Sequence, residues 1–400
     1  MLGLAHAPRI AVVGGGIGGL AAAGFLRRAG LTATVYEQAP ALGEVGAGLV
    51  AAPNAVRLLR RLGVMERFLS RAVSLDWGWE LRRWADGTVL SVERLTGVCE
   101  RLYGERTYVI HRADLLDTVR SAVPGRWIRL GARCTSVEAA GRDGVLLRFA
   151  DGGAVEADVV IGADGVHSVV RGAVTEPAPP EYSGICAFRT LVPAASAPDF
   201  ALRPAHTLWL GPERHFVHYP IAGGRAVNVV AFAPAGDYAD ESWSARATVE
   251  EFRAEFADWD PRVRALITAG GVPGRWALLD RAPLRHWSRG GITLLGDAAH
   301  PMFPFFAQGA AQSIEDAAVL ARCLAGSLDD PQQALKQYES ARLARTTHLQ
   351  RISRARRDVN HLPDGPAQQA RDTALADADP LVSNGWIYGY DAEAQLSDPE

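Results

Sequence analysis

Three glycines near the start of the chain have the spacing that brings backbone amides close to phosphate groups. Gly14, Gly16 and Gly19 follow residues 9–13, which are apolar from Ile10 onward, and precede a stretch rich in alanine and leucine. In such a strand–turn–helix unit the first glycine permits a sharp turn, the second lets a pyrophosphate approach, and the third lets the helix pack on the strand. Glu37 follows at the distance of a ribose-binding acid. The pattern predicts a site for FAD or NAD; a glycine-rich turn without a ligand is the alternative.

Two aspartates come directly after apolar runs later in the chain. Asp164 follows residues 159–163, and Asp297 follows residues 292–296. Ligands of α/β proteins bind at the carboxyl ends of parallel strands, and sugar or ribityl hydroxyls are good donors for a partly buried carboxylate. Either aspartate alone would favour a turn former or a helix N-cap. Together with the glycine unit, they favour one shared ligand.

A possible acid–base pair lies in the middle of the chain. In a strand, residues 215, 217 and 219 share a face, so His215 and Tyr219 would point the same way and His218 the other. A neutral histidine can accept a phenol proton near physiological pH. Spacing alone does not separate this interpretation from two polar residues on the solvent face of a sheet.

The three ligand-binding segments together resemble the ADP-binding, DG and GD motifs of the group A flavoprotein hydroxylases, the single-component aromatic monooxygenases. These motifs surround Gly14, Asp164 and Asp297 and occur in the order typical of that family. The resemblance covers most of the chain and implies tightly bound FAD rather than NAD. The sequence HRADL at residues 111–115 is similar to a family segment whose arginine reaches the flavin, which implies that role for Arg112.

Within the family, the chain is similar to the branch that contains salicylate hydroxylase and 6-hydroxynicotinate 3-monooxygenase. Three stretches carry this likeness, at residues 215–220, 296–311 and 385–391. The resemblance implies a substrate pocket that includes Gly48, Arg189, Pro304, Phe305 and Phe306. Phe305 and Phe306 replace polar residues of several relatives, so salicylate itself is not inferred as the substrate.

The resemblance also implies a reaction. NADH or NADPH reduces the flavin, O2 adds to give a C4a-hydroperoxide, and one oxygen atom enters a hydroxy- or aminobenzoate-like ring, with or without loss of a carboxylate. The N-terminal amides of an expected helix, at Gly309 and Ala310, would stabilise negative charge on the flavin. The apolar residues 301–306 would exclude water. An ordinary amphipathic helix and core packing are the alternatives. Similarity to the hydroxynicotinate enzymes favours His215 and Tyr219 as catalytic residues.

These motifs require a particular architecture. We predict a two-domain α/β (α+β) fold: a Rossmann-like FAD-binding domain of the p-hydroxybenzoate hydroxylase type, an inserted antiparallel-sheet substrate domain, and one long C-terminal helix. The FAD-binding domain would be discontinuous, over residues 1–72, 106–178 and 279–370. The substrate domain would comprise residues 73–105 and 179–278, followed by a tail, 371–400, that we expect to be mobile apart from its GWIYGYD stretch.

Composition excludes several other classes. A net charge of -3 argues against nucleic-acid binding. The charge-free residues 10–26 contain too many glycines for a membrane helix. Four scattered cysteines without a CxxC motif indicate no metal site and a reducing cytoplasm. We expect a cytoplasmic monomer or homodimer. A flavin reductase, a halogenase or a flavin-binding redox sensor is the alternative, although the only lysine, Lys336, lies far from every motif, which disfavours a halogenase.

Overall fold

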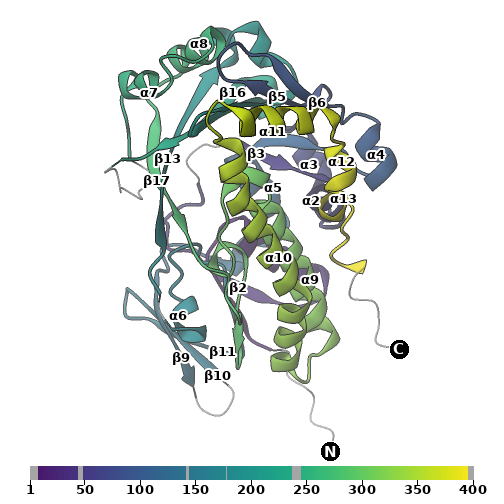
Figure 1. Cartoon of the computed structure of the whole chain (residues 1–400). Coiled ribbons are helices and arrows are strands. Elements are labelled where there is room, and N and C mark those ends of the chain that lie inside the picture. Colours follow the sequence, from purple (N-terminus) through teal and green to yellow (C-terminus); the bar gives the residue numbers. More distant parts are fainter. Residues whose placement is uncertain (1–7, 44–47, 141–143, 177, 237–244, 395–400) are drawn as a thin grey trace, which may run out of the picture.

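The computed structural model describes residues 8–43, 48–140, 144–176, 178–236 and 245–394. Two large sheets organise the chain, a six-stranded one in the lower part of Figure 1 and a seven-stranded one in the upper part. The long helix α10 (Pro331–Asn360) runs from the lower sheet towards the upper one. The boundary between the two sheets is therefore where residues from distant parts of the sequence meet.

The six-stranded sheet is built from short strands, of which β1 (Ile10–Val13), β12 (Val159–Gly162) and β19 (Ile292–Leu294) are fully buried. Its order is β18-β19-β12-β1-β2-β8, and all its pairs are parallel except β18 with β19. The strands are β1 (Ile10–Val13), β2 (Ala33–Tyr36), β8 (Ile128–Arg129), β12 (Val159–Gly162), β18 (Ser288–Arg289) and β19 (Ile292–Leu294). Such apolar strands are typical of a parallel sheet covered on both faces. The covering elements are α1 (Ile17–Arg28), α5 (Arg112–Arg120), α9 (Gly309–Gly326) and the antiparallel strands β9 (Cys134–Ala140), β10 (Gly144–Phe149) and β11 (Ala154–Ala157).

The seven-stranded sheet has the order β17-β13-β16-β15-β14-β5-β6, and only β14 and β5 pair in parallel. Its strands are β5 (Gly78–Arg83), β6 (Val89–Glu93), β13 (Glu181–Pro193), β14 (Ala205–Gly211), β15 (Arg214–Ile221), β16 (Ala226–Pro234) and β17 (Gly274–Asp280). Helices α7 (Val249–Glu255) and α8 (Pro261–Ala269) pack with apolar residues of one face. The other face contacts the elements that adjoin the six-stranded sheet.

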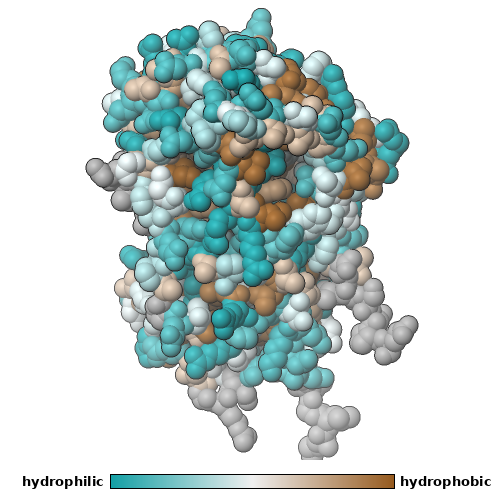
Figure 2. All heavy atoms as spheres, in the orientation of Figure 1, coloured by the Kyte–Doolittle hydropathy of each residue, from teal (hydrophilic) through white to brown (hydrophobic). Residues whose placement is uncertain are grey.

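Shorter elements make up much of the remaining described chain. They are the strands β3 (Gly48–Ala51), β4 (Val73–Ser74) and β7 (Tyr108–His111), and the helices α2 (Pro53–Arg61), α3 (Met65–Leu69), α4 (Val98–Tyr103) and α6 (Arg171–Val174). Single 3-10 turns are η1 (Gly125–Trp127), η2 (Ala194–Ser196), η3 (Asp199–Leu202), η4 (Ala222–Gly224), η5 (Gly296–Ala298) and η6 (Pro304–Phe306). Figure 2 shows apolar residues gathered between the upper and lower halves of the visible face.

The predicted fold class and long helix are confirmed, but the expected mobile tail is wrong for its described part. Residues 366–388 contain α11 (Pro366–Asp377), α12 (Pro380–Ser383) and α13 (Gly385–Tyr388). Outside the GWIYGYD stretch, Leu381 is buried and its carbonyl oxygen accepts a hydrogen bond from the Tyr103 hydroxyl. The charge-free residues 10–26 form β1, a turn and most of α1. No helix in the described ranges has the length and apolar character needed to cross a membrane.

Candidate active site

Two glycines of the turn, Gly14 and Gly19, lie directly against backbone atoms, whereas the third, Gly16, has free space beside it. Gly14 has φ of +107°, and a Cβ atom there would lie 2.3 Å from the carbonyl oxygen of Ala163. A Cβ on Gly19 would lie 2.0 Å from the carbonyl oxygen of Gly14. Gly16 is the N-cap of α1, and a Cβ there would meet no atom within 4 Å. The open space at Gly16 and the unpaired amides of the first helical turn fit a phosphate ligand.

Glu37 lies beside this turn and helps to fix it. One carboxylate oxygen accepts a hydrogen bond from the amide of Gly15 at 2.6 Å, and the other accepts one from the amide of Ala39 at 2.8 Å. An ionised carboxylate offers about four lone-pair sites. Glu37 can therefore hold the turn and still accept hydrogen bonds from ribose hydroxyls.

Asp164 is adjacent to the turn, but its carboxylate serves its own loop. It accepts hydrogen bonds from the Ser168 hydroxyl at 2.5 Å and from the Val169 amide at 2.7 Å. Burial nevertheless raises the pKa of this carboxyl above its ordinary value, against the effect of these hydrogen bonds. The turn-forming role that the sequence left open is thus present, and ligand binding by Asp164 stays a prediction.

Asp297 follows β19, and its side chain is exposed. The loop that carries it is tied to the Asp164 loop by Arg171. The Arg171 guanidinium donates to the carbonyl oxygens of Val166, Asp297 and Ala298 at 2.7–2.8 Å. Because β1, β12 and β19 are neighbours, the three sequence motifs meet at one edge of the six-stranded sheet.

We predict that the Asp297→Ala variant binds flavin about tenfold more weakly, since a hydrogen bond to a charged group contributes about 1.5 kcal/mol or more. The measurement is the flavin-to-protein absorbance ratio after gel filtration, followed by titration with FAD. Asp329→Ala, which removes an exposed carboxylate between α9 and α10, is the matched control. Full flavin retention by Asp297→Ala would remove this residue from the binding site.

Arg112 begins α5 at the same edge. His111 is the N-cap of that helix, and its Nδ1 accepts a hydrogen bond from the Ala113 amide at 3.2 Å. Burial lowers the pKa of the Arg112 guanidinium, and the nearby Asp297 carboxylate acts in the opposite direction. Arg112 therefore lies within electrostatic range of Asp297 in the GD motif, and its contact with the flavin stays a prediction.

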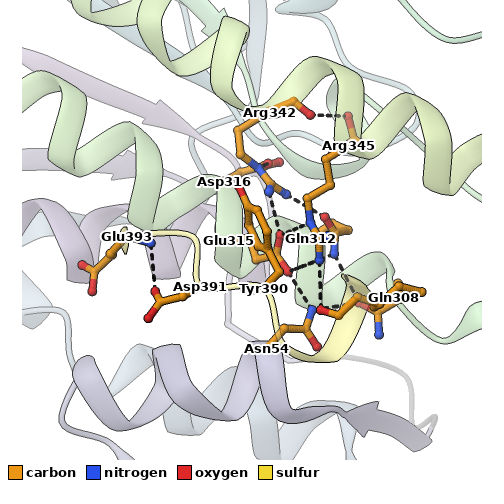
Figure 3. A network of polar contacts seen from close by, with 12 residues as sticks. Asn54, Gln308, Gln312, Glu315, Asp316, Arg342, Arg345, Tyr390, Asp391 and Glu393 are labelled. Atoms are coloured by element: carbon orange, nitrogen blue, oxygen red, sulfur yellow. Dashed lines mark hydrogen bonds and ion pairs between the residues drawn. The ribbon is translucent and has the colours of Figure 1, made fainter. Parts of the chain in front are cut away.

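A buried polar network holds the start of α9 in place (Figure 3). Arg342 on α10 donates to Glu315 at 2.6 Å and to Asp316 at 2.7 Å, and all three side chains are fully buried. Asn54 on α2 donates to Glu315 at 2.6 Å and to the Gln308 side chain at 2.9 Å. The network therefore connects α2, α9 and α10 directly below the amides that the sequence assigns to the flavin.

The same network reaches the GD motif. His300 Nε2 lies 2.6 Å from Asp316, which also accepts a hydrogen bond from the Gly296 amide at 3.1 Å. Gly309 and Ala310 are partly exposed, and a Cβ on Gly309 would meet no atom within 4 Å. The first turn of α9 is thus held by the buried network on one side and accessible at Gly309 and Ala310 on the other.

The seven-stranded sheet presents the candidate substrate residues. On β15, Val217 and Tyr219 pack with the apolar cluster at the boundary of the two sheets, whereas Phe216 packs with α7 and α8. His218 lies on the outer face, edge to face with Phe200 at 5.7 Å. The predicted division of the strand, His215 and Tyr219 on one side and His218 on the other, is present in the structure.

Tyr219 lies where the two halves of the molecule touch. A Cβ on Gly48 would be 2.4 Å from the Tyr219 ring, and the Gly48 amide donates to Asn228 at 2.8 Å. Arg189 on β13 stacks over Trp276 at 4.4 Å. Burial raises the pKa of the Tyr219 phenol, and Arg189 acts against it. Tyr219 is therefore a neutral phenol beside a cation.

We predict that Gly48→Ala displaces the Tyr219 ring and costs about 1–3 kcal/mol of stability, as overpacking usually does. Thermal unfolding of the holoenzyme measures the loss, and substrate titration shows whether Tyr219 has moved. Gly125→Ala is the control, because a Cβ at Gly125 would meet no atom within 4 Å. Unchanged stability and affinity in Gly48→Ala would contradict the close contact.

His215 is buried among aromatic rings. It stacks on Phe232 with ring centres 4.4 Å apart and meets Phe305 edge to face at 4.9 Å. Its Nδ1 lies 2.6 Å from Nε2 of His361, the residue after α10. Burial, assisted by His361 and Arg356, holds the pKa of His215 well below its ordinary value. His215 is therefore neutral near pH 7, and its Nδ1 is occupied by the contact with His361.

The loop before α9 forms one side of the same region. Phe305 contacts His215, Phe306 packs with the cluster that contains Tyr219, and Pro304 is exposed at the start of η6. Ala307 has φ of +52°, an unusual conformation for a residue with a Cβ. The apolar wall expected from the sequence is present for the two phenylalanines, whereas Pro304 lies at the surface.

The residues present fit FAD. The turn is open at Gly16, α9 is open at Gly309, and the exposed carboxylate of Asp297 lies between the motifs and near Arg112. Anion-binding helix ends and a carboxylate for hydroxyl groups are what a dinucleotide requires. When bound, the flavin would supply O2 activation and oxygen transfer, and the aromatic side of the seven-stranded sheet would hold the substrate.

Sequence reasoning missed Arg171, the Glu315–Asp316–Arg342 network and His361. Adjacent carboxylates inside the apolar helix α9 were a usable signal, because unpaired charges are costly to bury. Arg171 was visible only as the end of the DG segment. His361 gave no signal, since its partner is 146 residues away.

Comparisons with known proteins show the family to which the chain belongs. The family described as "FAD binding domain" matches residues 8–353. A 3-amino-4-hydroxybenzoate 2-monooxygenase of Streptomyces platensis is 45% identical and covers 96% of both chains. A 6-hydroxynicotinate 3-monooxygenase of Pseudomonas fluorescens is 38% identical over 88% of this chain and 91% of its own. A solved salicylate hydroxylase substrate complex is 29% identical, with a TM-score of 0.81 and 97% coverage of each chain. The resemblance drawn from the sequence is confirmed: the chain belongs to the FAD-dependent aromatic hydroxylases.

Proposed function

We propose that this enzyme hydroxylates 3-amino-4-hydroxybenzoate or a close aminohydroxybenzoate, using FAD, O2 and NADH or NADPH. The observation that carries the proposal is the placement of Arg189 and Tyr219 together at the boundary of the two sheets. Burial lowers the pKa of Arg189 to about 10, so the guanidinium remains charged at neutral pH and suits a carboxylate. Relatives named for this reaction are 42–45% identical over nearly the whole chain.

The geometry suggests how the ring is held. Four residues of strand separate Tyr219 from His215 by about 13 Å. Val217 and Val230 pair between them and offer an apolar floor for a single ring. Neutral His215 then accepts the proton of the ring hydroxyl, which makes the ring more electron-rich, and Phe305 limits access of water. His300, bonded to Asp316, has a supporting role.

The division into FAD-binding and substrate domains is also a proposal. All strands of the six-stranded sheet begin in the three segments assigned to FAD, and β13–β17 with β5 and β6 begin in the two assigned to substrate. Two boundaries cut an element, because residue 278 lies within β17 and residue 371 within α11. The four described cysteines are free and buried, which supports a reducing cytoplasm. A monomer or homodimer stays a prediction.

The test uses the purified yellow holoenzyme. Oxidation of NADH and of NADPH is followed with 3-amino-4-hydroxybenzoate, 6-hydroxynicotinate, salicylate and 3-hydroxybenzoate, and products are identified by mass spectrometry. The proposal expects coupled turnover with 3-amino-4-hydroxybenzoate and a product that gains one oxygen atom. The same mass spectrum would also show whether the product has lost the carboxylate. Faster coupled turnover of another acid would reassign the substrate, and nicotinamide oxidation without an oxygenated product would favour a redox sensor.

A further inference from the structure

His215 is part of a pair of histidines that reaches the surface. Its Nδ1 and Nε2 of His361 are 2.6 Å apart, a distance that requires one shared proton between the two rings. The second ring is held to the hairpin that carries the first, because the Glu213 amide donates to the His361 carbonyl at 3.0 Å. Glu213 has φ of +56° in the turn between β14 and β15. The pairing is thus fixed by backbone as well as by side chains.

His361 lines an open cleft of about 420 Å³ at the surface. Other lining residues are Ile185, Glu213, Pro234, Arg357 and Asp358. On the opposite side of the pair, His215 contacts Phe232 and Phe305 in the candidate substrate region. The two imidazoles therefore bridge a region walled by aromatic rings and a cleft open to water.

We propose that His215 and His361 form a proton relay that carries the proton of the substrate hydroxyl to solvent in this cleft. The inference rests on the proposed function, because it needs a substrate with an ionisable ring hydroxyl. The substrate O–H bond breaks and its proton joins Nε2 of His215. His215 then releases the proton on Nδ1 to Nε2 of His361, and His361 releases the proton on its Nδ1 to water. One proton leaves, no electron moves, and reverse tautomerisation resets both rings.

Charges around the pair keep both rings neutral, as the relay requires. Burial lowers the pKa of His361 to about 4, with Arg357 and Arg214 acting in the same direction and Asp358 against it. For His215, burial acts together with His361, Arg356 and His206. Arg214 is itself paired with Glu255 at 2.8 Å. Neither ring holds the proton as a stable imidazolium, so each passes it on.

The test compares the holoenzyme with its His361→Gln and His361→Ala variants. Each is mixed with 3-amino-4-hydroxybenzoate in weak buffer, and proton release is followed with a pH-indicator dye in a stopped-flow instrument. Substrate affinity is measured separately from the change in flavin absorbance, which also verifies folding. His286→Gln is the control, because the His286 side chain is 78% exposed and lies next to Glu339, away from the cleft.

The relay predicts that both His361 variants bind substrate nearly as well as the parent but release the proton roughly 10²-fold more slowly, the lower end of what a positioned acid or base contributes. Added imidazole should restore the rate in His361→Ala, since the cleft is open. Parental release rates in both variants, or slow release that imidazole does not restore, would overturn the relay. A parent enzyme that hydroxylates the substrate without releasing a proton overturns the relay alone. A parent that neither binds nor hydroxylates any phenolic acid contradicts the proposed function as well.

Discussion

Replacement of Arg342 by methionine is expected to lower the free energy of unfolding by about 3–5 kcal/mol, the usual cost of removing one member of a buried ionic group. Methionine keeps the apolar stem but leaves Glu315 without one of its cations, and Asp316 without its 2.7 Å donor. Urea unfolding with excess FAD measures the change. Arg351→Met, at an exposed position of the same helix, is the control and should stay within about 0.5 kcal/mol of the parent.

During acid titration, the Arg342→Met variant should unfold at a higher pH than the parent protein. Burial alone would raise the pKa of Asp316, but His300 and Arg342 outweigh it and lower the pKa to about 2. A carboxylate with a lowered pKa stabilises the folded state above its unfolded pKa of about 3.9, and this contribution is lost as the pH falls towards 2. Without Arg342 the pKa of Asp316 rises, so its contribution to stability is lost at a higher pH. A stability change under about 1 kcal/mol, with an unchanged acid transition, would mean that the network adds little to stability.

The features that could be predicted from sequence are those fixed by local geometry. Gly14, Gly16 and Gly19 act through one turn and its helix, and their spacing carries that information. The faces of β15 follow from the two-residue period of a strand, which separates His215 from His218 without knowledge of any partner. The convergence of the three motifs could be predicted from the family resemblance together with the expectation of a parallel sheet.

The features that were missed depend on pairing between distant segments. Arg342 pairs with Glu315 only because α9 and α10 pack together, and the residue spacing within either helix does not predict this pair. The C-terminal segment outside GWIYGYD is acidic and lacks a strong apolar period, which predicts mobility, yet Leu381 is buried there and its carbonyl oxygen accepts a hydrogen bond from the Tyr103 hydroxyl. Tertiary contacts supply the order that local composition does not indicate.

Arg189→Met is expected to raise the dissociation constant for 3-amino-4-hydroxybenzoate by about 10–100-fold, because a hydrogen bond to a charged partner is worth about 1.5–3 kcal/mol. The guanidinium stacks on Trp276 and is buried with Tyr219 and Arg112 in its electrostatic range. Two cations near one phenol favour an aromatic anion over a neutral ring. Flavin absorbance changes during substrate titration of the oxidised holoenzyme measure the affinity.

The comparison ligand makes this prediction specific to the carboxylate. 2-Aminophenol has the same ring substituents without the carboxylate, so its affinity should change little in Arg189→Met, and the preference for the acid should disappear. Arg264→Met, on the exposed side of α8, should leave both affinities unchanged. Equal weakening of both ligands would indicate a distorted pocket rather than a lost carboxylate contact. In that case the anion must be bound elsewhere, with Arg112 as the next residue to replace.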